Sequence, residues 1–413
     1  MLRISTVCLV VALAGCSRTA KTAPAPDSTG AVAPSIEIAD ASGDLLDIST
    51  LAAWDRVLYM AGRVTPKPNT LNKGVWVSRF EENKPNVWSL SQAQVLPELQ
   101  YSRDLTLVAE SATAVWILRS GETSGFFIDA LDFSPVGHRF TLPLPGDQLL
   151  QAAAPGISRK GMAVGGWSRA SAGGPIRSVL YFISPNGAIV QTVLGDEQTT
   201  HSDLIETSDE VLCLTRSTAP LTPDVLSVSS VDLNGNERWV RSVAVPGLGK
   251  GPGQEAVLTV DSKAIYAVGA AETQPGELVG VRRLWFWNLT RNGIPKSAPI
   301  FTAPIDWSVR HLARTADGAV VLTGTDISLF HVHVAQVRGG GAAGIEWHRS
   351  FNHGWFDASG PLQLIVARAV APLGVDRVAL LVDVITQEEL SASHLLTAST
   401  AKAGEVAAPP RSK

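Results

Sequence analysis

Ile265-Tyr-Ala-Val-Gly269 is one of seven short apolar runs that recur along the chain at intervals of 47 to 58 residues. The other six are Val57-Leu-Tyr-Met-Ala-Gly62, Val115-Trp-Ile-Leu118, Met162-Ala-Val-Gly-Gly-Trp167, Val211-Leu-Cys-Leu214, Val320-Val-Leu-Thr-Gly324 and Val378-Ala-Leu-Leu-Val382. Runs of this length that are apolar throughout are typical of strands buried on both faces. Their recurrence at a nearly constant period indicates a repeat architecture.

Each run has apolar neighbours on both sides, separated from it by turn residues. Val309-Arg-His-Leu-Ala313 precedes one run, and Phe330-His-Val-His-Val334 follows it. A turn and a fourth short stretch complete a unit of about 50 residues. Three of these turns contain an Asn-Gly pair, at Asn186-Gly187, Asn234-Gly235 and Asn292-Gly293. Because both central residues of a type I′ turn need positive φ, these pairs predict β-hairpins with that turn.

Seven such units predict an all-β fold, a seven-bladed β-propeller of four-stranded antiparallel blades. A single meander cannot bury both of its faces, whereas seven arranged radially can. Six or eight blades stay open because terminal units are atypical, and an all-β sandwich or a β-solenoid is the alternative architecture. We expect Ser35-Ile-Glu-Ile-Ala39 to close the ring beside the last blade, because that blade's own fourth strand, near residues 405–408, is weak.

The composition agrees with a folded chain that has a large core. Of 413 residues, 45% are hydrophobic and 17% are charged, and 34 Lys and Arg against 38 Asp and Glu give a net charge of −4. This balance excludes a disordered chain and a protein that coats nucleic acid, so no nucleic-acid partner is expected. The 36 glycines and 25 prolines are typical of many tight turns, and only three cysteines exclude a disulfide-stapled scaffold.

The first residues carry an export signal. Arg3 is followed by an apolar run at residues 7–13, which is too short to span a bilayer. Leu13-Ala14-Gly15-Cys16 resembles the lipobox of bacterial lipoproteins, with a plain signal peptide as the alternative. The resemblance implies cleavage before Cys16 and attachment of lipid, including acyl chains such as palmitate, to that residue. Because Ser17 follows where an aspartate would signal inner-membrane retention, the resemblance also implies an outer-membrane lipoprotein, on the periplasmic or the surface face.

The chain is therefore predicted to divide into four parts. Residues 1–15 form the signal peptide, residues 16–34 the lipidated cysteine with a Pro- and Ala-rich tether, residues 35–408 the propeller, and residues 409–413 a disordered tail. Cys8 leaves with the signal and Cys16 is acylated, so only Cys213 stays in the domain. Its place inside an apolar run predicts an inert, buried thiol.

One unit carries a recognisable outer-strand pattern. In Val231-Asp-Leu-Asn-Gly-Asn-Glu-Arg-Trp239 an aspartate and a turn glycine precede a tryptophan, and Trp88 and Trp347 occupy similar places. The pattern resembles the repeats of quinoprotein-like (PQQ-type) propellers, in which the tryptophan packs between blades. The adjacent cysteine pair of quinone-dependent members is missing from the sequence, so no cofactor is expected.

Histidines are concentrated late in the chain, where five of the eight lie between residues 311 and 353. His331 and His333 are two apart on one expected strand, so their rings share a face, and His348 lies on the expected partner strand. Neutral imidazoles at such spacing predict a site for Zn or Cu. The alternative is a solvated outer strand with polar side chains.

Two further groups of residues are candidate binding positions. Trp307, Trp355 and Phe356 lie in expected connecting segments, where exposed aromatic rings bind sugars or proteins, or else pack over a blade edge. Asp104, Asp203 and Asp306 precede expected innermost strands, where they would line a central channel or cap turns. No catalytic residue is assigned, because the sequence contains neither G-x-S-x-G nor H-E-x-x-H.

These features lead to one main functional hypothesis and two alternatives. The main hypothesis is a non-catalytic scaffold, tethered by lipid and monomeric, that offers loops on one face to an envelope protein or another ligand. The first alternative is a carbohydrate-active or other enzyme with its site in the central channel. The second is an accessory of outer-membrane protein assembly, because that machinery includes a propeller lipoprotein with PQQ-like repeats.

Overall fold

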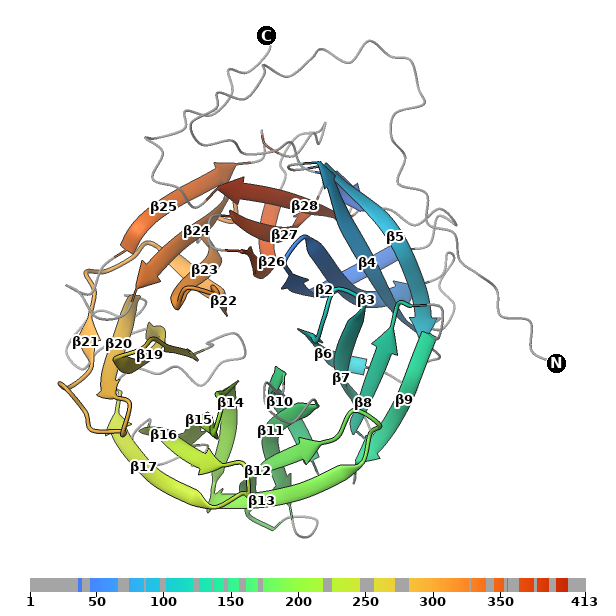
Figure 1. Ribbon diagram of the computed structural model, residues 1–413. Helices are drawn as coiled ribbons and strands as arrows, with labels where there is room; N and C mark the ends of the chain where they lie inside the picture. Colours follow the sequence, from blue (N-terminus) through green and yellow to red (C-terminus); the bar gives the residue numbers. More distant parts are fainter. Residues whose placement is uncertain are drawn as a thin grey trace, which may run out of the picture.

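The computed structural model contains seven four-stranded antiparallel sheets arranged as blades around one axis (Figure 1). It describes residues 36–38, 45–65, 74–84, 87–96, 102–121, 126–134, 137–144, 148–155, 161–169, 174–217, 225–245, 256–271, 282–326, 328–338, 345–352, 355, 364–374, 377–385 and 391–399. The predicted signal, tether and tail lie outside these residues. The blade count confirms the predicted all-β, seven-bladed propeller. Among the residues that the structure describes, no helix is long and apolar enough to cross a membrane.

The first four blades follow the chain without interruption. Blade 1 comprises β2 (Leu45–Trp54), β3 (Val57–Thr65), β4 (Gly74–Lys84) and β5 (Val87–Leu96). Blade 2 comprises β6 (Ser102–Ala109), β7 (Ala114–Gly121), β8 (Phe126–Asp132) and β9 (Gly137–Leu144). Blade 3 comprises β10 (Gln148–Pro155), β11 (Met162–Arg169), β12 (Ile176–Ile183) and β13 (Ile189–Glu197). Blade 4 comprises β14 (Thr199–Glu206), β15 (Glu210–Ser217), β16 (Val225–Asp232) and β17 (Glu237–Ala244).

The last three blades include one that is shortened and one that joins both ends of the domain. Blade 5 comprises β18 (Ala256–Val260), β19 (Ala264–Ala271), β20 (Arg283–Thr290) and the two-residue strand β21 (Ile300–Phe301). Blade 6 comprises β22 (Trp307–Arg314), β23 (Ala319–Asp326), β24 (His331–Arg338) and β25 (Ile345–Asn352). Blade 7 comprises β26 (Leu364–Leu373), β27 (Arg377–Ile385), β28 (Ser391–Ser399) and, from the start of the domain, β1 (Ile36–Ile38).

The first strand of each blade lies nearest the axis, where it contacts the first strand of the next blade (Figure 1). Because every blade repeats the same meander from the axis outward, these seven inner strands all run in one direction. They therefore begin at the same end of the ring, which we call the entry face. The second strands carry the recurring apolar runs, and all eight residues of β19 are buried, as expected for strands covered on both sides.

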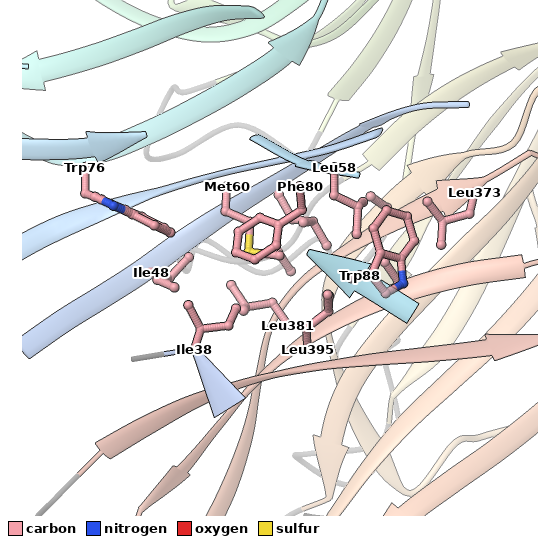
Figure 2. Packing of buried hydrophobic residues seen from close by; sticks show 14 of the residues in the cluster. Ile38, Ile48, Leu58, Met60, Trp76, Phe80, Trp88, Leu373, Leu381 and Leu395 are labelled. Carbon is pink, nitrogen blue, oxygen red and sulfur yellow. The ribbon is translucent and has the colours of Figure 1, made fainter. Parts of the chain in front are cut away.

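The ring closes through β1. Ile36, Glu37 and Ile38 pair antiparallel with Leu395, His394 and Ser393 of β28. Ile38 is buried in an apolar cluster that blades 1 and 7 share, with Ile48 on one side and Leu395 on the other (Figure 2). The predicted closure beside the last blade is thus confirmed, whereas the weak strand expected near residues 405–408 lies outside the described residues.

The Asn-Gly turns form hairpins, but the predicted turn type is wrong. Gly187, Gly235 and Gly293 have φ of 85°, 81° and 75°, whereas the asparagine before each of them is not in the left-handed region. The glycine N–H of the first turn donates to the carbonyl of Ser184 at 3.0 Å, which closes a type I turn. The left-handed glycine then adds a bulge to the outer strand, and this combination matches the twist of a hairpin as well as type I′ does.

Side chains that the sequence placed between blades are found there. Trp88, Trp239 and Trp347 contribute to three separate apolar clusters, each formed by two neighbouring blades. The ring of Trp239 lies against Gly293 in the hairpin turn of the next blade, where a Cβ would come within 2.4 Å of the indole. Cys213 is buried and unbridged, and burial raises the pKa of its thiol to about 12, so it stays protonated at neutral pH.

Candidate functional site

Trp307 is the first residue of β22, and its indole is buried rather than exposed. Only 1% of the residue is accessible, although the sequence placed it in a connecting segment. The reason is Gly324 on the neighbouring strand β23. A Cβ on this glycine would lie 2.9 Å from Cε3 of the indole, so only a residue without a side chain lets the ring lie across the strand.

Two imidazoles from the outer half of blade 6 lie parallel to this indole. The centroid of the Trp307 ring is 5.3 Å from that of His333 on β24 and 5.8 Å from that of His348 on β25. The two imidazole centroids are 5.2 Å apart, and all three ring planes agree within 8°. We call these three rings the blade 6 cluster.

The two imidazoles of the cluster are joined edge to edge. His333 Nδ1 and His348 Nε2 are 3.0 Å apart and share one hydrogen bond. His333 is buried, and its Nε2 has no hydrogen-bond partner among the described residues. Burial, reinforced by the charge of His348, lowers the pKa of His333 to about 4, and burial also lowers the pKa of His348. Both rings are therefore neutral at neutral pH, with the edge of His348 exposed to solvent.

Asp306 and His331 lie beside the cluster but differ in their relation to it. Asp306 is exposed just before β22, and its negative charge raises the pKa of both His333 and His348, against the effect of burial. His331 instead places Nδ1 at 3.0 Å from Oδ2 of Asp326, at the end of β23. Asp326 also accepts the backbone N–H groups of Phe330 and His331, so it organises the short loop between β23 and β24.

The predicted metal triad is only partly assembled. The structure brings His333 and His348 together and directs His331 to a carboxylate. Within the described ranges, no group of three or more His, Cys, Asp or Glu side chains is placed to hold a metal ion. What the cluster offers chemically is a flat, uncharged surface whose exposed imidazole edge can donate or accept a hydrogen bond.

Blade 5 contributes to the exposure of this cluster. Trp307 belongs to an apolar core shared by blades 5 and 6, so its face of blade 6 is turned toward blade 5. The outer strand of blade 5, β21, has two residues, whereas β25 of blade 6 has eight. The outer part of blade 6, which carries His348, therefore lacks the cover that a full outer strand would provide.

A second feature of the ring is a set of β-bulges on the inner strands. Six of the seven inner strands carry extra residues within their first five positions, and β18 is regular. The extra residues are Ser49, Arg103 with Asp104, Gln151, Ser202, Arg310 and Arg368. Every one of them is polar. An alternating pattern cannot reveal where one strand has gained a residue, so these bulges could not be located before the structure was known.

The three aspartates predicted near the inner strands have different places. Asp203 on β14 is buried, and its Oδ2 accepts the backbone N–H of Leu258 at 2.7 Å and Nη1 of Arg314 at 2.9 Å. Burial raises the pKa of Asp203, and the charge of Arg314 opposes this. Asp104 lies in the bulge of β6, and Asp306 lies beside the blade 6 cluster. The structure thus separates the three aspartates, because Asp104 lies in blade 2, Asp203 in blade 4 and Asp306 directly before blade 6.

Of the other two aromatic candidates, one is described. Trp355 is partly buried and packs edge-on against Phe351, with ring centroids 5.6 Å apart and an angle of 87°. It covers the apolar core between blades 6 and 7. Phe356 lies outside the described residues, as does the predicted lipid-attachment residue Cys16.

Comparison with known proteins identifies the fold and nothing finer. No protein-family model and no curated protein sequence matches the chain. Among solved structures, the β-propeller domain of the Trilobed protease from Pyrococcus furiosus is similar at 10% identity and a TM-score of 0.50, over 87% of this chain and 96% of that one. That domain is described as having an open velcro topology, whereas here β1 pairs with β28.

Two further structures are similar at lower scores. An apocarotenoid oxygenase variant from Synechocystis is 11% identical with a TM-score of 0.47, over 91% of this chain and 94% of that one. A protein of unknown function from Dyadobacter fermentans is 11% identical with a TM-score of 0.46, over 90% and 99% of the two chains. At such identities the likeness extends to the fold alone.

Proposed function

We propose that this chain is a lipid-anchored envelope β-propeller that binds a protein partner or another ligand at its entry face without catalysing a reaction. The observation that carries the proposal is a set of polar residues on the inner strands of a closed ring. The bulged residues of six inner strands lie at or before the strand midpoint, in the half of the ring nearer the entry face, and the blade 6 cluster begins at the entry end of β22. Loops and strand ends at one end of a rigid scaffold are the usual binding positions of such folds.

The bonding of the buried acids favours binding over acid-base chemistry. The Asp203 carboxylate is held by Leu258 and Arg314. The Asp383 carboxylate is similarly held, by Arg368 and by the hydroxyl of Ser393 at 2.8 Å. Carboxylates fixed in this way hold blades and strands together.

Anchoring by lipid is the part of the proposal that rests on the first residues of the chain. Cys16 ends a lipobox-like sequence, and residues 17–34 form a tether that, as a flexible coil, would reach about 23 Å. Such a tether would hold the ring off the membrane surface. Ser17 favours the outer membrane by the same resemblance.

Crosslinking and capture of the full chain from its native envelope test this proposal. We expect a reproducible envelope partner that is lost with Cys16→Ala, which removes the anchor, and reduced with His348→Ala, which removes the exposed edge of the cluster. Arg241→Ala, on the exposed outer strand of blade 4, is the matched control and should leave capture unchanged. Capture that is indifferent to Cys16→Ala and to His348→Ala, or a chain recovered alone, would contradict the proposal.

A further inference from the structure

Two arginines occupy the same bulge position on adjacent inner strands. Arg310 is the extra residue of β22, and Arg368 is the extra residue of β26. These two strands are neighbours around the axis. The equivalent residues Ser49, Gln151 and Ser202 are uncharged, and in β6 the bulged Arg103 is accompanied by the opposite charge of Asp104. Among the described inner strands, β22 and β26 are therefore the adjacent pair in which each bulge adds an arginine without an acid beside it.

Arg368 is already held in place. Its Nε donates to Oδ2 of Asp383, which is buried and which also accepts the hydroxyl of Ser393. Its Nη2 lies 3.8 Å from Oδ1 of Asp47 on β2, a longer contact to a carboxylate that is 55% exposed. A guanidinium fixed along one edge keeps its other N–H groups pointing outward in a defined direction, so it loses little entropy when a ligand binds.

Arg310 is the opposite case. It is exposed, and it has no ion-pair partner among the residues that the structure describes. The two arginines lie on inner strands that contact each other around the axis, and the charges of both lower the pKa of His311, which falls to about 4 mainly through burial. A neutral His311 adds no charge, so the pair consists of one balanced and one unbalanced cation.

From this arrangement we infer that Arg310 and Arg368 together bind an oxyanion, a carboxylate or phosphate group of the ligand, in the half of the ring nearer the entry face. The inference rests on the proposed function and names the chemistry that the ligand presents. Two guanidinium groups on adjacent strands provide the forked N–H donors that carboxylate and phosphate oxygens accept, and Arg310 supplies the charge that the protein itself leaves unmatched. Asp47 is the internal competitor, since its carboxylate lies on the free side of Arg368.

The test uses the full chain and small probes. Glutarate and inorganic phosphate are titrated separately by calorimetry or NMR, with glutaramide as the uncharged match for glutarate. We expect at least one anion to bind. The anion that binds more tightly shows whether the ligand presents a carboxylate or a phosphate group. Arg310→Gln should weaken that binding about tenfold or more, as for the loss of a charged hydrogen bond. Arg241→Gln on blade 4 should leave it unchanged.

Asp47→Asn supplies a readout that a structural role for these arginines would not give. Removing the competing carboxylate should tighten anion binding several-fold, and raising the ionic strength should weaken it. The inference is overturned if neither anion binds, if glutaramide binds as well as glutarate, or if Arg310→Gln binds as the native chain does. If Arg310→Gln captured the envelope partner as well as the native chain does, only this inference would be overturned. If an anion bound but no envelope partner were captured, only the proposed function would be overturned.

Discussion

Arg314 in blade 6 reaches across blade 5 to Asp203 in blade 4, where its Nη1 lies 2.9 Å from Oδ2 of the carboxylate. The same oxygen accepts the N–H of Leu258 in blade 5, and Nη1 of Arg314 is also 3.3 Å from the Leu258 carbonyl. One carboxylate therefore joins three consecutive inner strands. Blade 5 has the shortest inner strand, β18, and this contact holds it between its neighbours.

Removal of the Asp203 carboxylate is expected to destabilise the ring. Asp203→Ala leaves the Leu258 N–H without its acceptor and Arg314 without its partner, which should cost about 3 kcal/mol of the free energy of unfolding. Urea unfolding of the two chains measures the difference. Asp209→Ala is the control, because Asp209 pairs with Arg238 on the surface and its loss should cause no measurable change. Equal effects of the two substitutions would refute the assignment.

Acid should weaken the fold through His201. This residue is buried in β14, its Nδ1 has no hydrogen-bond partner among the described residues, and burial lowers its pKa from 6.5 to about 4. Between these values the unfolded chain binds a proton that the folded chain does not, so stability is lost as the pH falls from 6.5 to about 4. The pKa difference corresponds to about 3 kcal/mol at most.

The substitution His201→Leu isolates this contribution. Leucine has a similar volume and no proton to bind, so the variant should lose less stability than the native chain between about pH 7 and about pH 4.5. Urea unfolding at the two pH values gives the slopes. The same slope for both chains would mean that other groups account for the acid sensitivity.

The fold was predictable from the sequence because its decisive signal is repeated. Seven apolar runs at a nearly constant spacing leave few architectures, and an error in one unit does not change the reading of the other six. The turn type was not predictable in the same way. An Asn-Gly pair fits a type I′ turn, and it fits equally a type I turn in which only the glycine has positive φ.

The candidate site was predictable only in part, because its contacts cross strands and blades. The spacing of His331 and His333 indicated a shared strand face, but Asp326 decides which partner His331 takes. Trp307 was expected in a connecting segment, either exposed for binding or packed over a blade edge, because nothing near it in the chain shows that Gly324 leaves room for its ring. Likewise Arg314 is separated from Asp203 by 111 positions, so no local pattern links the two.

Loss of β1 should destabilise the domain. A chain that begins at Gly43 lacks the residues that pair with β28, leaving that strand's edge open and Ile38 absent from its apolar cluster. We expect its thermal midpoint to fall by about 3 °C or more and its tendency to aggregate to rise. A chain that begins at Ser35 removes the tether but keeps β1, so it is the matched control. Calorimetry of the two chains would contradict the closure if their midpoints coincided.

The geometry of the blade 6 cluster should depend on Gly324. A Cβ at this position would lie 1.6 Å from the carbonyl oxygen of Ser308, so Gly324→Ala must separate β22 from β23 and displace the indole of Trp307. We expect a loss of about 3 kcal/mol in stability. The pKa of His348, lowered by burial in the native chain, should rise toward its ordinary value in an NMR titration, because the displaced ring no longer covers it.

A second glycine separates this effect from the general cost of changing a glycine. Gly137 has φ of 79° and open space around it. Because asparagine accepts the left-handed region, the fold should tolerate Gly137→Asn. This control should lose less than about 1 kcal/mol of the free energy of unfolding and leave the pKa of His348 unchanged. If Gly324→Ala also left the His348 titration unmoved, the parallel arrangement of the three rings would not depend on the missing side chain at Gly324. The burial of Trp307 would then need another cause.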